Sequence, residues 1–284
     1  MKNNMRKLSL MLSTALVAVS CGAPGKLQVN PENNFPIVDM DGGQAIVAHR
    51  GYWLCEAGGN SQNSIASLKA AQDLKFWGSE CDIHITADDR IIVNHDNDID
   101  GLAIAEHTFA ELSSHLLQNG ETRPSFDELL DQAKKGSKST ILVVEFKVMP
   151  SEARQDLLIE KALAAIKAHG LYKPSKVAFI SFSHYACKRI AELCPGFINQ
   201  YLMGDIAPAE LAGEGINGID YHYNIFYQHP DWVKQAHDCG MSVNVWTVDN
   251  RADMEKVLAM GVDAVTTNYP EVTREVLGGA DFKK

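Results

Sequence analysis

The chain has 284 residues, with 26 basic and 36 acidic side chains and a formal net charge of −10. This acidic balance argues against nucleic acid as a partner, because such binding needs Lys and Arg side chains that neutralise backbone phosphates. An anionic small molecule would have to be met by a local cluster of cations or by a metal ion. A chain of this length can bury one full hydrophobic core.

The first 43 residues are typical of an export signal and a tether. Residues 1–7 carry three basic side chains and no acidic one, and the apolar run that follows at 8–19 is too short to cross a bilayer, so residues 1–20 are predicted to be a secretory signal peptide. Small residues lead into Cys21, as in the lipobox of bacterial lipoproteins. We expect Cys21 to be lipidated, residues 21–43 to be a tether, and the protein to be exported and anchored to the outer membrane on its periplasmic side. The alternative is plain secretion, with Cys21 an ordinary thiol.

From residue 44 onward, short strand-like runs alternate with helical patterns. Strands are predicted at residues 45–48, 78–86, 140–146, 177–181, 198–202, 218–221, 243–248 and 264–267. Helices are predicted at residues 64–73, 151–169, 185–193, 207–212, 231–238 and 251–260. Eight strands that could each be followed by a helix predict an α/β fold, the (β/α)₈ TIM barrel, for residues 44–284. A doubly wound open sheet is the alternative, but no glycine-rich phosphate-binding fingerprint follows the first strand.

A segment after the second barrel strand breaks the alternation. A strand-like run at 90–95 is followed by an insertion of about residues 96–130, which ends at a helix predicted for 125–135. The start of the insertion, residues 96–101, matches the opening of an EF-hand calcium loop. The twelfth position of that loop is His107, where a bidentate glutamate is required, so we interpret the segment as an acidic, solvated turn.

Carboxylates lie where two of the predicted strands end, the place where TIM barrels carry their chemistry. Glu80, Asp82 and His84 are spaced by two and therefore share one face of their strand, with the intervening apolar residues facing the helices. Glu145 and Lys147 repeat the pattern on the next barrel strand. Buried carboxylates are costly unless they are paired or bind a metal. Three of them form an oxygen-rich setting, which favours the binding of Mg²⁺ or Ca²⁺ and disfavours that of zinc.

Three of these residues have simpler interpretations. Glu145 and Lys147 could be an ion pair inside the barrel. His84 could touch the substrate or the metal, but a hydrogen-bonded support is the interpretation we favour.

Four motifs resemble, in the same order, those of the glycerophosphodiester phosphodiesterase family. They are His49-Arg50-Gly51, Glu80-Cys81-Asp82, Asn94-His95-Asp96 and Glu145-Phe146-Lys147. Residues 245–248 and 261–270 resemble the last two strands of that family, so the likeness runs from about residue 45 to 275. One position departs from the family pattern: Gln62 stands where a glutamate is usual, which bears on the charge of the site and on substrate preference.

The resemblance implies a barrel that binds one divalent hard cation, Mg²⁺ or Ca²⁺, through Glu80, Asp82 and Glu145. It also implies a catalytic pair, His49 and His95, and phosphate contacts from Arg50 and Lys147. Trp246 could stack on the apolar part of the substrate or belong to the core.

The activity that these expectations describe is the metal-dependent hydrolysis of a small phosphodiester to glycerol 3-phosphate and an alcohol. Imidazole titrates near neutral pH and can act as base or acid, so the two histidines suit a route through a cyclic phosphate. The alternatives are the same site acting on another phosphodiester, such as a lysophospholipid, and a substrate-binding lipoprotein without catalysis. No nucleic-acid partner is expected, and membrane contact is expected only through the lipid anchor.

Overall fold

The computed structural model describes residues 43–136 and 138–278, and eight parallel strands close into a barrel within them. Strand β1 pairs with β11 on one side and with β2 on the other, which closes the ring. The TIM barrel predicted from the alternation of elements is therefore confirmed. The expected signal peptide, lipidated Cys21 and all but the last residue of the tether lie outside the described residues. The barrel strands are β1 (Ala45–Ala48), β2 (Gly78–Ile85), β6 (Ile141–Phe146), β7 (Val177–Ser181), β8 (Asn199–Tyr201), β9 (Gly218–His222), β10 (Ser242–Trp246) and β11 (Ala264–Thr267).

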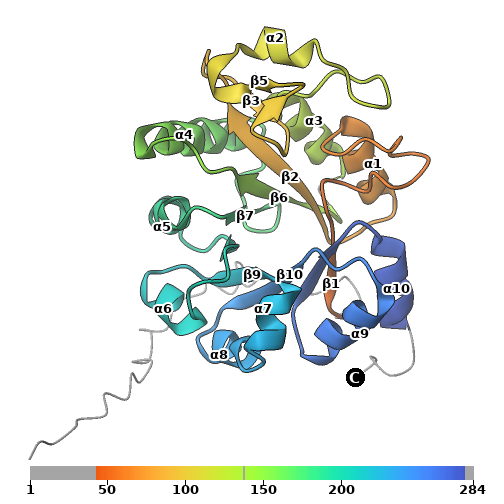
Figure 1. Ribbon diagram of the computed structural model, residues 1–284, viewed down its shortest axis with the longest axis vertical. Coiled ribbons are helices and arrows are strands. Elements are labelled where there is room, and N and C mark those ends of the chain that lie inside the picture. The colour runs from red at the N-terminus through yellow and green to blue at the C-terminus, as the bar shows by residue number, and fades with distance from the viewer. Residues whose placement is uncertain (1–42, 137, 279–284) are drawn as a thin grey trace, which may run out of the picture.

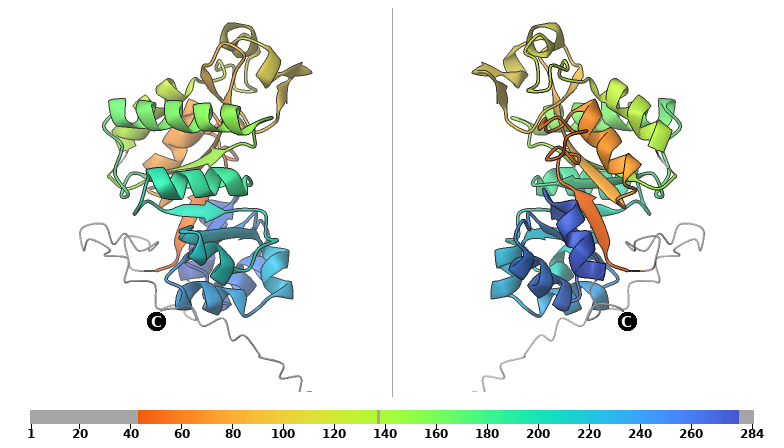
Figure 2. Two further views of the ribbon diagram at one scale, coloured as in Figure 1. Left: turned by 90° about the vertical axis from the view of Figure 1, so that its left-hand side faces the viewer. Right: turned by 90° about the vertical axis from the view of Figure 1, so that its right-hand side faces the viewer.

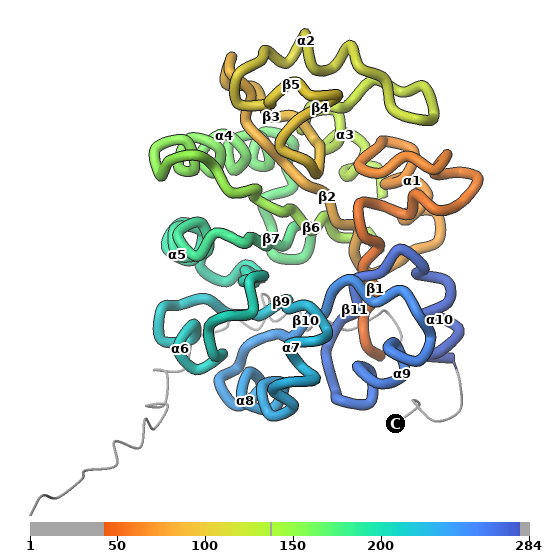
Figure 3. The backbone as a smooth tube through the Cα atoms, viewed as in Figure 1, coloured from red at the N-terminus to blue at the C-terminus, as the bar shows by residue number. Residues whose placement is uncertain are grey.

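Helices follow one another around the outside of the barrel in chain order (Figures 1 and 3). They are α1 (Ile65–Asp73), α3 (Phe126–Gly136), α4 (Glu152–Ala168), α5 (His184–Leu193), α6 (Pro208–Gly213), α7 (Tyr223–Gln228), α8 (Trp232–Asp238), α9 (Arg251–Ala259) and α10 (Pro270–Gly278). Helices α7 and α10 were not predicted. None of the helices in the described ranges is long and apolar enough to cross a membrane.

The strands are buried on both faces, as a parallel sheet covered by helices requires. Alternate residues of β2, such as Cys81 and Ile83, pack outward against α3 and α4. A second apolar set fills the inside of the barrel and includes Val47, Val143 and Ile180. The period-two pattern of β2 therefore sends its apolar residues to the helices and leaves Glu80 and Asp82 on the inside, as predicted.

The insertion forms a small cap of its own at the end of β2. Strand β3 (Ile91–Val93) runs antiparallel to β2, and β4 (Asp98–Ile99) forms a short hairpin with β5 (Leu102–Ala103). A 3₁₀ helix, η2 (Ile104–Glu106), and helix α2 (Phe109–Ser113) complete the cap, which projects beyond the barrel (Figure 2). Helix α3, predicted as the end of the insertion, instead packs between α1 and α4 in the ring of barrel helices.

The acidic segment of the insertion is a hairpin turn and not a calcium loop. Asp100 and Gly101 both adopt positive φ, at 52° and 84°, between the paired residues Ile99 and Leu102. Two consecutive positive φ values are the signature of a type I′ hairpin turn, for which Asp-Gly is a preferred pair. The predicted acidic turn is confirmed.

Candidate active site

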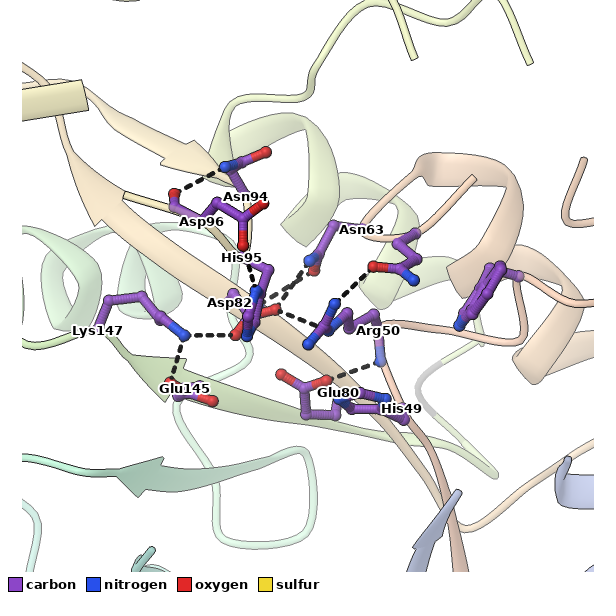
Figure 4. Close-up of polar contacts among 12 residues, drawn as sticks. His49, Arg50, Asn63, Glu80, Asp82, Asn94, His95, Asp96, Glu145 and Lys147 are labelled. Carbon is purple, nitrogen blue, oxygen red and sulfur yellow. Dashed lines mark hydrogen bonds and ion pairs between the residues drawn. The ribbon is translucent and has the colours of Figure 1, made fainter. Parts of the chain in front are cut away.

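Polar side chains from separate parts of the chain meet at the carboxyl ends of the first barrel strands (Figure 4). His49 and Arg50 follow β1, while Glu80 and Asp82 lie on β2. Glu145 lies at the end of β6, and Lys147 comes directly after that strand. His95 follows β3 and approaches from the side of the insertion. The described structure thus brings the predicted catalytic, metal-binding and phosphate-binding residues into one region, apart from Trp246, which is treated below.

The three carboxylates meet because of the register of the sheet. Asp82 on β2 is the direct partner of Glu145 on β6, and Glu80 lies two residues earlier on the same face as Asp82. One carboxylate oxygen from each of the three lies within 4.8 Å of the other two. The relative exposures of Glu80, Asp82 and Glu145 are 3%, 1% and 7%, so all three are effectively removed from water.

Two cations lie beside the carboxylates and differ in what they contact. Lys147 Nζ is 2.9 Å from Glu145 Oε1 and 3.3 Å from Asp82 Oδ1, so its charge is shared between two acids. Arg50 Nε is 3.8 Å from Asp82 Oδ2, which is beyond hydrogen-bond distance. Asn63 holds Asp82 by donating from Nδ2 to Oδ2 at 2.8 Å and accepting from the Asp82 backbone N–H at 3.1 Å.

The carboxylates have unequal proton affinities. Burial, together with the charge of Asp82, raises the pKa of Glu145 to about 7 and also raises that of Glu80. Burial acts on Asp82 in the same direction, but Lys147, His95 and the hydrogen bond from Asn63 hold its pKa below the usual range. Without a further cation, the cluster therefore cannot keep all three carboxylates charged at low cost.

The triad fits a divalent hard cation. Glu80 Oε2 accepts the backbone N–H of Arg50 at 2.7 Å, but its buried Oε1 has no hydrogen-bond partner among the described residues. An ion would satisfy this oxygen and the excess negative charge together, and carboxylate oxygens are the donors that Mg²⁺ and Ca²⁺ prefer. The simple ion-pair interpretation of Glu145 and Lys147 does not account for Glu80.

His49 is held by a network that the sequence did not reveal. Its Nδ1 lies 2.9 Å from Asn268 Oδ1, and Trp53 Nε1 donates to the same oxygen at 3.0 Å. Asn268 is fixed in turn, because its Nδ2 donates to Asp249 Oδ2 at 2.7 Å and its backbone N–H donates to Asp249 Oδ1 at 2.9 Å. Since Asn268 Nδ2 faces a carboxylate, Oδ1 is the atom that faces His49.

The network determines the protonation of His49. An amide oxygen can only accept, so His49 Nδ1 carries the proton and Nε2 is left with a free lone pair. Burial, reinforced by the charge of Arg50, lowers the pKa of His49 to about 4. His49 is therefore a neutral imidazole near pH 7.

His95 has a carboxylate neighbour in place of an amide. Its Nδ1 lies 2.7 Å from Asp96 Oδ1, and its ring is about two-fifths exposed. Burial lowers its pKa, while Asp82 and Asp96 act in the opposite direction. His84 Nε2 contacts the backbone oxygen of His95 at 3.3 Å, which supports the interpretation of His84 as a hydrogen-bonded support for this segment.

Arg50 and Trp246 are held by neutral partners. Arg50 Nη1 donates to Gln62 Oε1 at 2.6 Å. Trp246 is half-buried above the apolar interior of the barrel, and its Nε1 donates to the backbone oxygen of Asp220 at 2.8 Å. Its ring makes edge contacts with Phe182 and His222.

Among the site residues that the sequence analysis missed, Asn268 and Asn63 carried usable signals. Asn268 comes directly after the last barrel strand, and that position alone marks it as a candidate. Asn63 comes directly before Ser64, the cap of α1, and an asparagine at such a position suggests the left-handed conformation that the structure shows, with a φ of 54°. Asp249, whose carboxylate accepts hydrogen bonds from Asn268 and Thr267, carried a weaker signal, because it lies three residues beyond the end of β10.

Comparisons with known proteins agree on one family. Residues 49–272 match the model of the glycerophosphoryl diester phosphodiesterase family. A crystal structure of a glycerophosphodiester phosphodiesterase from Parabacteroides distasonis is 41% identical, covers 82% of this chain and 96% of its own, and superposes with a TM-score of 0.79. A glycerophosphodiester phosphodiesterase from Caldanaerobacter subterraneus is 26% identical over 80% of this chain and 94% of its own. An Oleispira antarctica phosphodiesterase, in complex with the product sn-glycerol-3-phosphate, shares the fold at 21% identity, with coverages of 84% and 98% and a TM-score of 0.71.

Proposed function

Because this chain belongs to the glycerophosphoryl diester phosphodiesterase family, we propose that it hydrolyses glycerophosphodiesters to glycerol 3-phosphate and an alcohol. The observation that carries the proposal is the meeting of two histidines with a buried triad of carboxylates at the mouth of the barrel. A diester carries one negative charge and is stable in water, so its cleavage needs charge neutralisation, an activated nucleophile and a protonated leaving group.

Glu80, Asp82 and Glu145 would hold one divalent cation, Mg²⁺ or Ca²⁺. When bound, such an ion neutralises charge at the phosphoryl oxygens. Arg50 and Lys147 lie beside the triad and would contact the phosphate, with the guanidinium suited to two parallel hydrogen bonds. Trp246 would contact the alcohol part of the substrate, since its ring lies in the aromatic group that includes Phe182 and His222.

His49 is suited to the role of general base. It is neutral near pH 7, its proton is held on Nδ1, and Nε2 has a free lone pair. Nε2 would take the proton from a glycerol hydroxyl as that oxygen attacks phosphorus, so that the P–O bond to the alcohol breaks and a cyclic phosphate forms. Water would then open the ring to glycerol 3-phosphate, with the proton transfers reversed.

His95 is suited to the role of general acid. Burial lowers the pKa of both histidines, but His95 is less completely buried than His49 and its neighbours Asp82 and Asp96 favour its protonated form, whereas His49 is hydrogen-bonded to a neutral amide. A protonated His95 would give its proton to the departing alcohol oxygen. Its ring lies next to the insertion and is about two-fifths exposed, so an alcohol released beside it would have access to solvent.

The cellular setting rests on the N-terminal sequence. We propose that the protein is exported and held at the outer membrane, on the periplasmic side, by a lipid on Cys21. The barrel would then act on small diesters in the periplasm, with no nucleic-acid partner and with the anchor as its membrane contact.

The test is the release of glycerol 3-phosphate from a panel of glycerophosphodiesters, with and without a chelator. We expect His49→Ala and Glu145→Gln to abolish most of the turnover, and we expect the exposed controls His229→Ala and Glu160→Gln to leave it intact. Turnover that survives chelation or either site variant would refute the mechanism. A preference for lysophospholipids would assign the site to another phosphodiester. Binding without turnover would favour the alternative of a substrate-binding lipoprotein without catalysis.

A further inference from the structure

Gln62 is the hydrogen-bond acceptor for the guanidinium of Arg50. The distance from Arg50 Nη1 to Gln62 Oε1 is 2.6 Å, and Arg50 Nε is buried without a hydrogen-bond partner among the described residues. The nearest acid, Asp82, lies 3.8 Å from that Nε (Figure 4). The positive charge of Arg50 is therefore met at hydrogen-bond distance by a neutral amide oxygen and not by a carboxylate.

The loop that carries Gln62 is fixed at the next residue. Asn63 donates its backbone N–H to the Arg50 oxygen at 2.9 Å and holds Asp82 through its side chain at 2.8 Å. Ser64 then caps α1 by accepting the N–H of Ser67. These contacts hold the backbone on the C-terminal side of Gln62, and none of them involves the Gln62 side chain, so an isosteric substitution there changes the charge and leaves them in place.

The charges around the triad show what this neutral contact does. Lys147 lies within 3.3 Å of two carboxylates and is committed to them, whereas Arg50 is not. Three carboxylates, these two cations and one divalent ion together give a single positive charge, which matches the single negative charge of a phosphodiester. A glutamate at position 62 would pair with Arg50 and cancel that charge before any substrate arrived.

We propose that Gln62 sets the affinity of the site for anions, by orienting Arg50 while leaving the charge of its guanidinium available to phosphate. This inference deepens the proposed function and rests on it, because it takes Arg50 as a phosphate contact. Gln62 acts through Arg50 and is a positioning residue. The ligands it favours are phosphodiesters and free phosphate, in contrast to neutral or cationic molecules of the same shape.

The experiment compares Gln62→Glu, which adds a charge at constant shape, with Gln62→Met, which removes the acceptor without adding a charge. Calorimetry measures the binding of inorganic phosphate to the ion-loaded protein, and steady-state kinetics separate kcat from KM. We expect Gln62→Glu to weaken phosphate binding and to raise KM by about tenfold, with a change in kcat of less than about threefold. We expect Gln62→Met, which loses the orientation of Arg50 but adds no charge, to weaken phosphate binding and to raise KM by about threefold, less than Gln62→Glu does. Gln228→Glu, which adds the same charge at an exposed site, is the control.

Three outcomes would overturn the inference. They are unchanged phosphate binding in Gln62→Glu, equal losses in the Glu and Met variants, and a loss confined to kcat. Failure of the proposed function gives a different result, since wild-type protein would then turn over no diester while calorimetry still reported phosphate affinity. Melting temperatures of the variants separate a binding defect from a folding defect.

Discussion

Replacing Glu145 by Gln tests the metal site without relying on catalysis. In the ion-free protein, burial raises the pKa of Glu145 from 4.5 to about 7. A carboxyl group whose pKa is raised by folding stabilises the fold below the unfolded pKa, and this stabilisation is lost as pH rises through the folded pKa. At about 1.4 kcal/mol for each pKa unit, the ionised Glu145 costs about 3 kcal/mol of stability at pH 8.

Glutamine keeps the shape of the side chain and removes the charge. Ion-free Glu145→Gln should therefore be more stable than wild type at pH 8, by up to about 3 kcal/mol. The substitution also removes the 2.9 Å ion pair between Glu145 and Lys147, which reduces this gain in stability. Lys147 keeps its 3.3 Å ion pair with Asp82. Near pH 4.5 the difference should almost disappear, because wild-type Glu145 is then protonated in the folded state.

Adding Mg²⁺ or Ca²⁺ should reverse the order of the two proteins. An ion at 1,000 times its dissociation constant stabilises the folded state by about 4.1 kcal/mol, which raises the melting temperature of a barrel of this size by about 8 to 16 °C. Wild type should gain this increment. Glu145→Gln should gain little of it, because one of the three ligands has lost its charge.

Thermal unfolding at pH 8, with chelator and then with excess ion, measures both effects. Glu160→Gln on the exposed side of α4 is the matched control and should follow wild type throughout. An ion-free Glu145→Gln that is less stable than wild type would refute the cost assigned to the buried charge. A variant that keeps the full response to the ion would refute the assignment of Glu145 as a ligand.

Three further predictions concern the histidines. Asn268→Ala frees the Nδ1 proton of His49 and should lower kcat by about 100-fold with little change in KM, as measured by steady-state kinetics on a folded variant. His95→Ala should nearly abolish the release of alkyl alcohols but spare a p-nitrophenyl diester, whose leaving group needs no proton, and equal losses on both substrates would contradict the acid role. Arg123 donates to Asn94 at 2.8 Å, next to His95, so Arg123→Ala should show the same leaving-group dependence at about three- to tenfold, with Arg123→Lys restoring part of the rate.

The barrel could be predicted because its signals are local. Each buried parallel strand appears as a short apolar run, and each surface helix carries its own periodicity and often its own cap, such as Ser64 for α1. Helix α7 was missed because it begins directly after the end of β9 at His222, whereas α6, which also spans six residues, begins at Pro208, several residues after β8. Helix α10 was missed although Pro270 at its start is a recognised signal for the first turn.

The carboxylates of the site could be predicted for the same reason, whereas the hydrogen-bond partner of His49 could not. The period of two in a strand puts Glu80 and Asp82 on the same inner face, and this pattern predicts a buried polar site. The link from Asn268 to His49 joins residues 219 positions apart, and its meaning depends on which side of the amide faces the ring. That geometry follows from the closure of β11 on β1, which no local pattern specifies.

The acceptors of the two histidines explain how one side chain can take two roles in the same site. Asn268 offers His49 a neutral oxygen, so a proton added to Nε2 gains no opposite charge from this partner, and burial keeps the imidazole neutral. Asp96 offers His95 a carboxylate, which stabilises the charged ring, and the less complete burial of His95 opposes the charged form less than it does for His49. When the environments of two like groups favour the neutral form of one and the charged form of the other, the first is suited to act as a base and the second as an acid. The difference between an amide and a carboxylate partner, set in the loops after β11 and β3, thus acts together with the difference in burial to assign the base and the acid of the proposed reaction.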